Sequence, residues 1–182
     1  NSYQQTKYEA ELLVQAQAKK FPIVIFRPPF IISPNSSGGK VNFLSILISL
    51  VAKGHLPCVT GSEKSTMDLV KADDAAKIIV RLLLKEKLSY ITYHITNGAT
   101  ALDIGTFHKM IEVKMGKHIP VEYCGNIESF SKRVNEISKE RPEVLEVYKK
   151  AESFLLEPAY PKIFDNHHTL TEIGSLRLGE NP

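Results

Sequence analysis

The chain has 182 residues, of which 43% are hydrophobic and 24% are charged, and its formal net charge at pH 7 is +3. This composition is typical of a soluble globular protein of about one domain, and it argues against disordered, collagen-like and coiled-coil proteins. The charge is too small to indicate a nucleic-acid partner, and no apolar run approaches the roughly 20 residues that span a bilayer. We therefore expect a cytoplasmic protein with no nucleic-acid partner and no membrane span.

The cysteines argue against a metal site. Cys58 and Cys124 are the two cysteines of the chain, and they show no C-x-x-C or Cys/His spacing. Such spacing is typical of a structural zinc site, whereas isolated cysteines are usual in a reducing compartment. We expect no bound metal, and the chain is long enough to fold without a disulfide.

The first part of the chain predicts a helix, a buried strand and a long loop. Good helix formers and a capping residue, Ser2, predict a helix over 2–20 that Pro22 ends. The continuous β-branched run over 23–26 is typical of a strand buried on both faces of a parallel sheet. Residues 27–40 are rich in Pro and Gly, so they predict a loop at the carboxyl end of that strand, where open α/β sheets bind ligands.

Helices and strands continue to alternate up to about residue 97, and helices dominate beyond it. In chain order, the pattern predicts a helix over 41–53, a loop over 55–65, a short strand over 67–70, a helix over 75–85 that Asp73 caps, a strand over 90–96, a helix over 102–115, a strand over 119–123, and two amphipathic helices over 126–140 and 143–157. We therefore predict an α/β fold with two regions, residues 1–97 and a mostly helical region over residues 98–182.

Tyr3 and Lys7 form a Tyr-x-x-x-Lys pair at the start of the first predicted helix. The i, i+4 spacing puts both side chains on one helix face, with Cβ atoms about 5–6 Å apart. An ammonium group beside a phenol favours loss of the phenol proton, so such a tyrosine can protonate a carbonyl oxygen as hydride reaches the carbon. Taken alone, the pair is better explained as part of a solvated helix face, because pairs at this spacing are common by chance.

The order of the motifs resembles the second half of an extended short-chain dehydrogenase/reductase. Tyr-x-x-x-Lys is followed by a strand ending Arg27-Pro28, a breaker-rich loop, an apolar helix and the sequence MDLVKADDAA over 67–76. Within that superfamily, RPPFIISPNSSG over 27–38, followed by Asn42, looks most like the thioester reductase branch. This branch contains the terminal domains of nonribosomal peptide and polyketide synthases, which are related to carboxylic acid reductases and fatty acyl-CoA reductases.

The resemblance implies a partial Rossmann-like sheet with a mostly helical, substrate-binding cap at the C-terminal end. The dinucleotide-binding half is expected to be absent, because no Gly-x-Gly-x-x-Gly follows a predicted strand and the chain opens directly on the Tyr-x-x-x-Lys helix. In the implied site, Tyr3 is the general acid and also contacts the cofactor, and Lys7 is its electrostatic partner and a ribose ligand. The resemblance further implies that Pro28, Pro29 and Phe30 lie beside the nicotinamide and that Asn42 binds the substrate.

The implied activity is NADPH-dependent reduction of an acyl thioester, held on a phosphopantetheine carrier, to an aldehyde or alcohol. The cofactor is then NADP(H), with NAD(H) left open, and the partners are an acyl-phosphopantetheine carrier protein domain and the missing N-terminal part of the same polypeptide. We expect the 182-residue chain to be inactive alone.

Two alternatives remain open. A nucleotide-sugar epimerase or dehydratase of the same superfamily shares Tyr-x-x-x-Lys and the Arg-Pro strand end. A basic pocket for a pyrophosphate would favour the epimerase or dehydratase, whereas a long apolar channel would favour the reductase of a carrier-bound thioester. The second alternative is a non-catalytic interaction module in which the Tyr-x-x-x-Lys pair is accidental.

Overall fold

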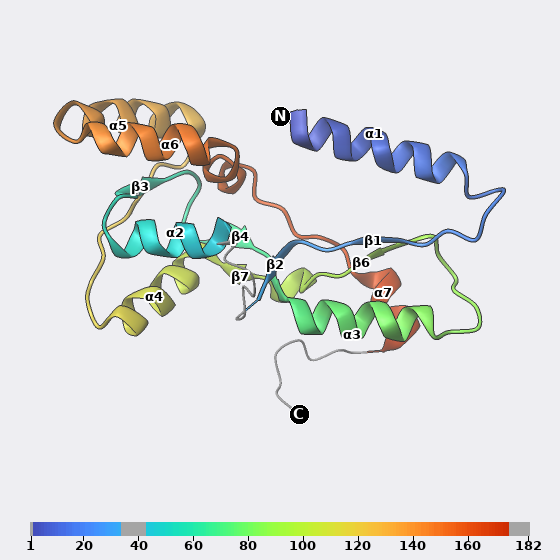
Figure 1. Cartoon of the computed structure of the whole chain (residues 1–182). Helices are drawn as coiled ribbons and strands as arrows, with labels where there is room; N and C mark the ends of the chain where they lie inside the picture. The colour runs from blue at the N-terminus through green and yellow to red at the C-terminus, as the bar shows by residue number, and fades with distance from the viewer. Residues whose placement is uncertain (1, 34–42, 175–182) are drawn as a thin grey trace.

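The computed structural model describes residues 2–33 and 43–174, and it confirms the predicted α/β class (Figure 1). The helices are α1 (Ser2–Ala16), α2 (Phe43–Ala52), α3 (Ala72–Leu83), α4 (Ile104–Met115), α5 (Ile127–Glu140), α6 (Pro142–Leu155) and α7 (His167–Ile173), with short 3₁₀ turns η1 (Gly98–Thr100) and η2 (Glu157–Ala159). The strands are β1 (Ile25–Arg27), β2 (Phe30–Ile32), β3 (Cys58–Val59), β4 (Thr66–Met67), β5 (Leu69–Lys71), β6 (Thr92–His94), β7 (Leu102–Asp103) and β8 (Glu122–Tyr123).

The strands pair across long sequence separations. Within the described residues, β1 pairs with β6, β2 with β5 and β3 with β8 in parallel, and β4 pairs with β7 in antiparallel orientation. The β1–β6 register sets Ile25 opposite Thr92 and Arg27 opposite His94. In Figure 1, α1 lies on one side of the β1–β6 pair and α3 lies on the other, which is the layering of a doubly wound sheet.

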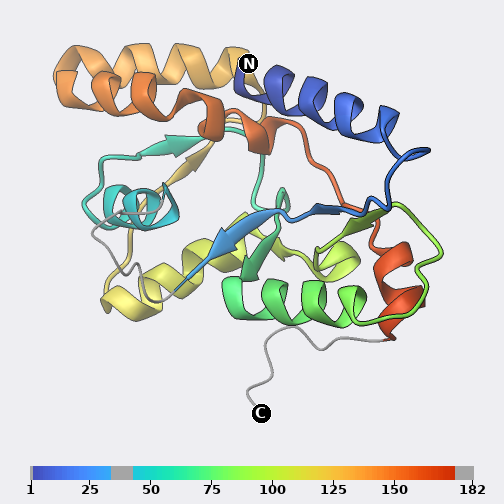
Figure 2. The same cartoon turned by 45° about the vertical axis from the view of Figure 1, so that its right-hand side comes forward.

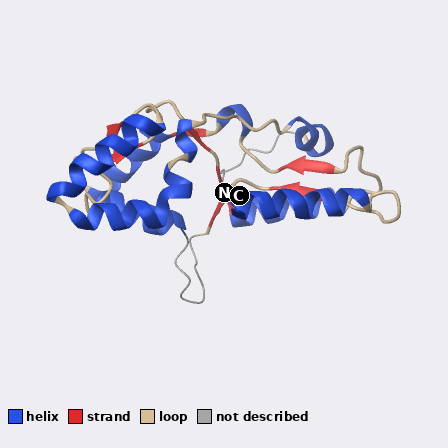
Figure 3. Cartoon of the chain, turned by 90° about the horizontal axis from the view of Figure 1, so that it is seen from above, coloured by secondary structure: helices blue, strands red, loops and turns tan. Residues whose placement is uncertain are grey.

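Two hydrophobic clusters hold the described chain together. One lies between α3 and the β1–β6 pair and buries Val70, Ala75, Ile78, Leu82, Tyr93 and Ile95. The other joins α2, α4, α5 and α6 and buries Val51, Leu56, Cys58, Ile111, Ile119, Phe130, Val134, Val144, Tyr148, Ala151 and Leu155. Figure 3 shows the corresponding groups of helices at opposite ends of the molecule. The second cluster takes buried residues from both sides of residue 97, and the partly buried Ile173 packs against the first cluster from beyond that residue. A domain division at residue 97 stays a prediction.

Most predicted helices are confirmed, with differences at their ends. The first helix, α1, ends at Ala16 and continues as turns rather than as helix to residue 20. The prediction that Asp73 caps α3 is wrong, because the N-cap is Lys71, which makes no side-chain capping bond. Asp73 lies instead in the first turn, where a carboxylate interacts favourably with the helix dipole.

The segment predicted as one loop over 27–40 contains the strand β2. Pro28 and Pro29 cannot donate backbone hydrogen bonds, but both precede β2, so Phe30–Ile32 can pair with Leu69–Lys71. The expectation that the first strand is buried on both faces is also wrong. Ile25 and Phe26 are half-buried, since β1 pairs with β6 alone in the described part of the chain.

The described helices are short or polar. Across residues 2–33 and 43–174, none is both long and apolar enough to cross a membrane.

Candidate functional site

A pocket of about 700 Å³ opens beside the N-terminal turn of α1. Its walls come from α1, from the β1–β2 connection, from β4 and from the segment that follows α6. Apolar and aromatic side chains dominate these walls, with Tyr3 at one edge; examples are Pro29, Phe30, Ile31, Met67 and Phe164. An apolar concavity with a few polar groups is the usual form of a small-molecule site.

The structure places Tyr3 and Lys7 on the same face of α1. Lys7 Nζ lies 5.9 Å from the centroid of the Tyr3 ring, as the i, i+4 spacing requires. Tyr3 lines the pocket and is 66% exposed, whereas Lys7 does not contribute to the pocket wall. The Tyr3 side chain therefore borders the pocket, and the Lys7 ammonium group lies near its ring.

Of the four further residues expected at the site, the structure places two at the pocket. Pro29 and Phe30 line the same pocket as Tyr3. Pro28 is exposed and is not among the residues that line it. Asn42 lies outside the described residues. The structure thus gathers one helix turn and the start of β2 at the pocket.

One wall of the pocket escaped the sequence analysis. The segment 156–166 follows α6, and Pro158, Tyr160, Lys162 and Phe164 all line the pocket. Pro158 lies in the 3₁₀ turn η2, whereas Tyr160, Lys162 and Phe164 stand at every second position, which is the spacing of an extended chain with one face toward a cavity. The alternation over 160–164 is a signal that could have indicated this wall.

Asp68 also lines the pocket, and its carboxylate is already engaged. The side chain is buried and accepts hydrogen bonds from the Asn97 backbone N–H at 3.1 Å and from Asn97 Nδ2 at 2.7 Å. Asn97 Nδ2 also donates to the Leu69 carbonyl at 2.9 Å. These bonds tie the β4–β5 connection to the end of β6, so Asp68 shapes the pocket as a structural group.

Arg27 connects β1 to α1 through Glu11. The guanidinium donates to both Glu11 oxygens, and this hydrogen bonding lowers the pKa of Glu11 and raises that of Arg27. Arg27 also lies 3.0 Å from His94 Nε2, and His94 Nδ1 lies 2.7 Å from the Asp165 carbonyl oxygen. Because a carbonyl only accepts, Nδ1 carries the proton and Nε2 accepts from Arg27.

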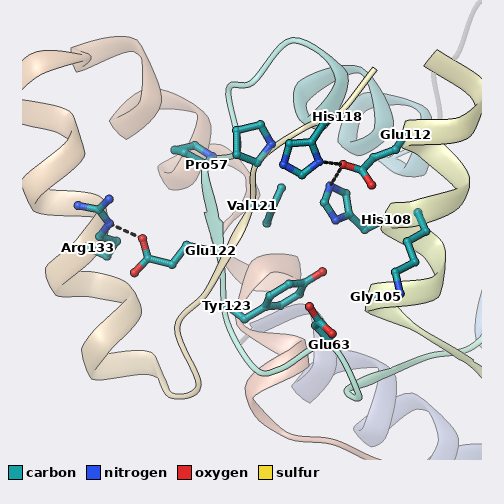
Figure 4. Close-up of a pocket in the computed structure, with 12 residues that line it drawn as sticks. Pro57, Glu63, Gly105, His108, Glu112, His118, Val121, Glu122, Tyr123 and Arg133 are labelled. Carbon is teal, nitrogen blue, oxygen red and sulfur yellow. Dashed lines mark hydrogen bonds and ion pairs between the residues drawn. The ribbon is translucent and has the colours of Figure 1, made fainter. Parts of the chain in front are cut away.

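A second pocket, of about 550 Å³, lies between α4, β8 and α5 (Figure 4). Glu112 accepts from the Ile119 backbone N–H at 2.8 Å and pairs with His118 Nδ1 at 2.6 Å, and these contacts hold its pKa below the usual range. Arg133 pairs with Glu122 at 2.7 Å. The charges of this pocket thus largely pair with one another, and the described residues contain no group of three or more His, Cys, Asp or Glu arranged to hold a metal.

Comparison with known proteins agrees with this layout. Residues 1–79 match the model of an NAD-binding family described as "Male sterility protein". The terminal R domain from the myxalamid PKS-NRPS biosynthetic pathway is 16% identical, with a TM-score of 0.65, over 96% of this chain and 43% of that domain. A nucleoside-diphosphate-sugar epimerase from Pseudomonas aeruginosa is 15% identical, with a TM-score of 0.64, over 97% of this chain and 50% of the epimerase.

A UDP-glucuronic acid 4-epimerase from Bacillus cereus, solved with UDP-glucuronic acid and NAD, is 25% identical, with a TM-score of 0.51, over 66% of this chain and 38% of the epimerase. No curated protein matches the sequence. As these coverages show, the chain spans half or less of the length of each of the three solved structures. Its first 79 residues match the NAD-binding male sterility protein family, and the chain has the Rossmann-like fold of the extended short-chain dehydrogenases/reductases.

Proposed function

We propose that this chain is the substrate-binding part of a nicotinamide-dependent reductase that acts on a carrier-bound acyl thioester. The observation that carries the proposal is the position of Tyr3 at the edge of a pocket of about 700 Å³ with mainly apolar walls. Supporting observations are the family match over residues 1–79 and the similarity in fold to a terminal R domain. An acyl chain suits such walls, because its burial is favourable and it needs no polar partners.

Three of the residues expected to hold a nicotinamide dinucleotide line the pocket, namely Tyr3, Pro29 and Phe30. Pro29 and Phe30, with Pro28 before them in the chain, would lie along the nicotinamide. Lys7 lies outside the pocket wall with its ammonium group near the Tyr3 ring, and that group would bind ribose hydroxyls. When bound, the dinucleotide supplies the hydride. We propose NADPH as the hydride donor. In this fold class the residue that distinguishes the 2′-phosphate of NADPH from the 2′-hydroxyl of NADH follows a glycine-rich turn, and this sequence contains no such turn.

Tyr3 then acts as the proton donor of the reaction. Its hydroxyl donates a proton to the thioester carbonyl oxygen as hydride adds to the carbonyl carbon, which gives a hemithioacetal. Lys7 stabilises the phenolate that remains. Collapse of the hemithioacetal breaks the C–S bond, the hydroxyl proton leaves with the thiol, and the product is an aldehyde. Reduction of the aldehyde to an alcohol needs a hydride from a second NADPH and a proton, which Tyr3 donates again after it is reprotonated.

The proposed partners are the N-terminal half of the reductase and a phosphopantetheine carrier domain. Two-stranded parallel pairs are rare, since parallel strands normally lie inside larger sheets covered on both faces. Here β1 pairs with β6 alone in the described part of the chain, and apolar side chains of the flanking helices are exposed, including Leu13 of α1 (71%) and Leu84 at the end of α3 (79%). Further parallel strands and their helices would cover these groups.

Nucleotide-sugar epimerisation is the second candidate, and the 25% identity with the Bacillus cereus epimerase favours it. A sugar nucleotide needs cationic groups for its pyrophosphate. Lys162 of the pocket wall already pairs with Glu157, so this pocket offers less to a pyrophosphate than to an acyl chain.

The experiment joins the chain to an N-terminal dinucleotide-binding half of the same superfamily and supplies NADPH with an acyl-pantetheine thioester or, separately, a UDP-sugar. Release of free thiol together with NADPH oxidation is the expected result. Epimerised UDP-sugar without thiol release would favour the second candidate, and no turnover of either substrate would leave the non-catalytic interaction module. Thioester reduction by the 182-residue chain alone would contradict the need for an N-terminal half.

A further inference from the structure

The segment 156–166 is fixed to the strands beneath it by hydrogen bonds to its backbone. Ser65 Oγ donates to the Pro158 carbonyl at 3.0 Å, and Thr66 Oγ1 donates to the Lys162 carbonyl at 2.6 Å. In Figures 1 and 2 the segment passes beside the N-terminal end of α1 on its way from α6 to α7. It therefore presents a stable surface to the first turn of α1.

Glu157 stands on this segment and faces α1. Its Oε1 accepts a hydrogen bond from Gln4 Nε2 at 2.8 Å, and its Oε2 pairs with Lys162 Nζ. The Glu157 side chain is 25% exposed, so it is partly buried. Both oxygens thus have fixed partners, and Gln4, Glu157 and Lys162 all line the same pocket as Tyr3.

The helix α1 depends on such polar contacts because its side chains are mostly exposed. Glu11, in its third turn, binds Arg27 of β1. Gln4, in its first turn, binds Glu157, which stands 153 residues later. Tyr3 immediately precedes Gln4, so the Gln4–Glu157 bond fixes the turn that presents the phenol to the pocket.

We propose that Glu157 is a positioning residue that holds Tyr3 at the pocket by binding Gln4. The proposal rests on the proposed reductase function. Glu157 neither transfers a proton nor contacts the reacting carbonyl; it keeps the first turn of α1 against the fixed segment. Misplacement of a reacting group by about 1 Å is enough to slow a reaction substantially.

The test compares Gln4→Ala with a matched control, Gln5→Ala. Gln5 is also exposed, but it donates to Glu9 within α1 at 2.7 Å, so its loss leaves the contact with Glu157 intact. Alanine is the best helix former, which offsets the small loss of helix stability when Gln5→Ala removes the exposed i, i+4 bond to Glu9. Hydrogen exchange of the backbone amides of residues 5–9 is measured in the 182-residue chain, and kcat and KM are measured in the chain joined to its N-terminal half.

Gln4→Ala is expected to speed exchange at least about fivefold and to lower kcat about tenfold, with KM changed less than about twofold, while Gln5→Ala changes neither. Glu157→Ala should behave like Gln4→Ala. Glu157→Gln keeps an oxygen that accepts from Gln4, so amide exchange in residues 5–9 and kcat should both stay close to those of the unsubstituted protein. Equal exchange in Gln4→Ala and Gln5→Ala would overturn the proposal. The exchange measurement needs no turnover, so absence of reduction in the unsubstituted enzyme would contradict the proposed function and not the contact.

Discussion

The buried hydroxyl of Tyr93, in β6, donates a hydrogen bond to Glu172 Oε1 of α7 at 3.2 Å. The same carboxylate accepts from the Ser89 backbone N–H at 2.7 Å and pairs with Lys85 Nζ at 3.1 Å. Hydrogen bonds from Ser89, and then the bond and charge of Lys85, lower the pKa of Glu172 to about 2. This carboxylate therefore fastens the last described helix to α3 and the β1–β6 pair.

Glu172 should make the stability of the chain depend on pH in the acid range. Because its pKa falls from about 4.5 to about 2 on folding, its contribution is fully present above about pH 4.5 and is lost as pH falls toward 2. Glu172→Gln should lower the free energy of unfolding at pH 7 and flatten its slope across that window. Urea unfolding between pH 2 and pH 7 measures this. Glu86→Gln, at an exposed position, is the control; an unchanged slope in Glu172→Gln would contradict the assignment.

Tyr148 should stabilise the helical end of the molecule through β3. Its buried hydroxyl accepts from the Cys58 backbone N–H at 3.2 Å and donates to the Cys58 carbonyl. Tyr148→Phe leaves both backbone groups without this partner, so the free energy of unfolding should fall by about 1–3 kcal/mol. Chemical denaturation measures the loss, and Tyr160→Phe, at an exposed position, should change stability by less than about 0.5 kcal/mol. Equal effects of the two variants would count against the contact.

Gly61 allows the segment 156–166 to lie against the loop after β3. It has φ +78°, and a Cβ there would lie 2.3 Å from the Pro158 carbonyl oxygen. Gly54 has a similar φ of +70° with open space around the Cβ position. Gly54→Ala should therefore cost about 1–2 kcal/mol from backbone strain alone, and Gly61→Ala about 1–3 kcal/mol more from the clash. Thermal or urea unfolding of both variants gives the difference, and equal losses would refute the close approach.

The two thiols should react slowly in the folded chain. Burial is the largest cause of the raised pKa values of Cys58 and Cys124, and the pKa of Cys124 rises to about 12. The thiolate is the reactive form, so alkylation of Cys124 at pH 8 should be about 2,000-fold slower than that of a free cysteine with a pKa of about 8.5. Mass spectrometry after iodoacetamide treatment measures this, with the urea-unfolded chain as control. Similar rates in both states would contradict the burial.

The sequence predicted what depends on neighbours along the chain, and it missed what depends on distant contacts. Helical spacing predicts Tyr3 and Lys7 on one face of α1, as the structure shows. Their role at a reductase site stays a prediction of the family resemblance. The pairing of Phe30–Ile32 with β5 was missed because Pro28 and Pro29 mark a loop locally, while the partner strand lies some 40 residues away. Glu157 was missed for the same reason, since its partner Gln4 stands at the other end of the chain.

The proposed role of Tyr3 as proton donor is tested by the single-turnover rate of thioester reduction in the chain joined to an N-terminal dinucleotide-binding half. Tyr3→Phe keeps the ring and removes the proton, so the rate should fall by about 100-fold or more. Tyr8→Phe removes the hydroxyl of another exposed tyrosine of α1 and should leave the rate unchanged. A Tyr3→Phe enzyme that reduces the thioester as fast as the Tyr8→Phe enzyme would show that Tyr3 is not the proton donor.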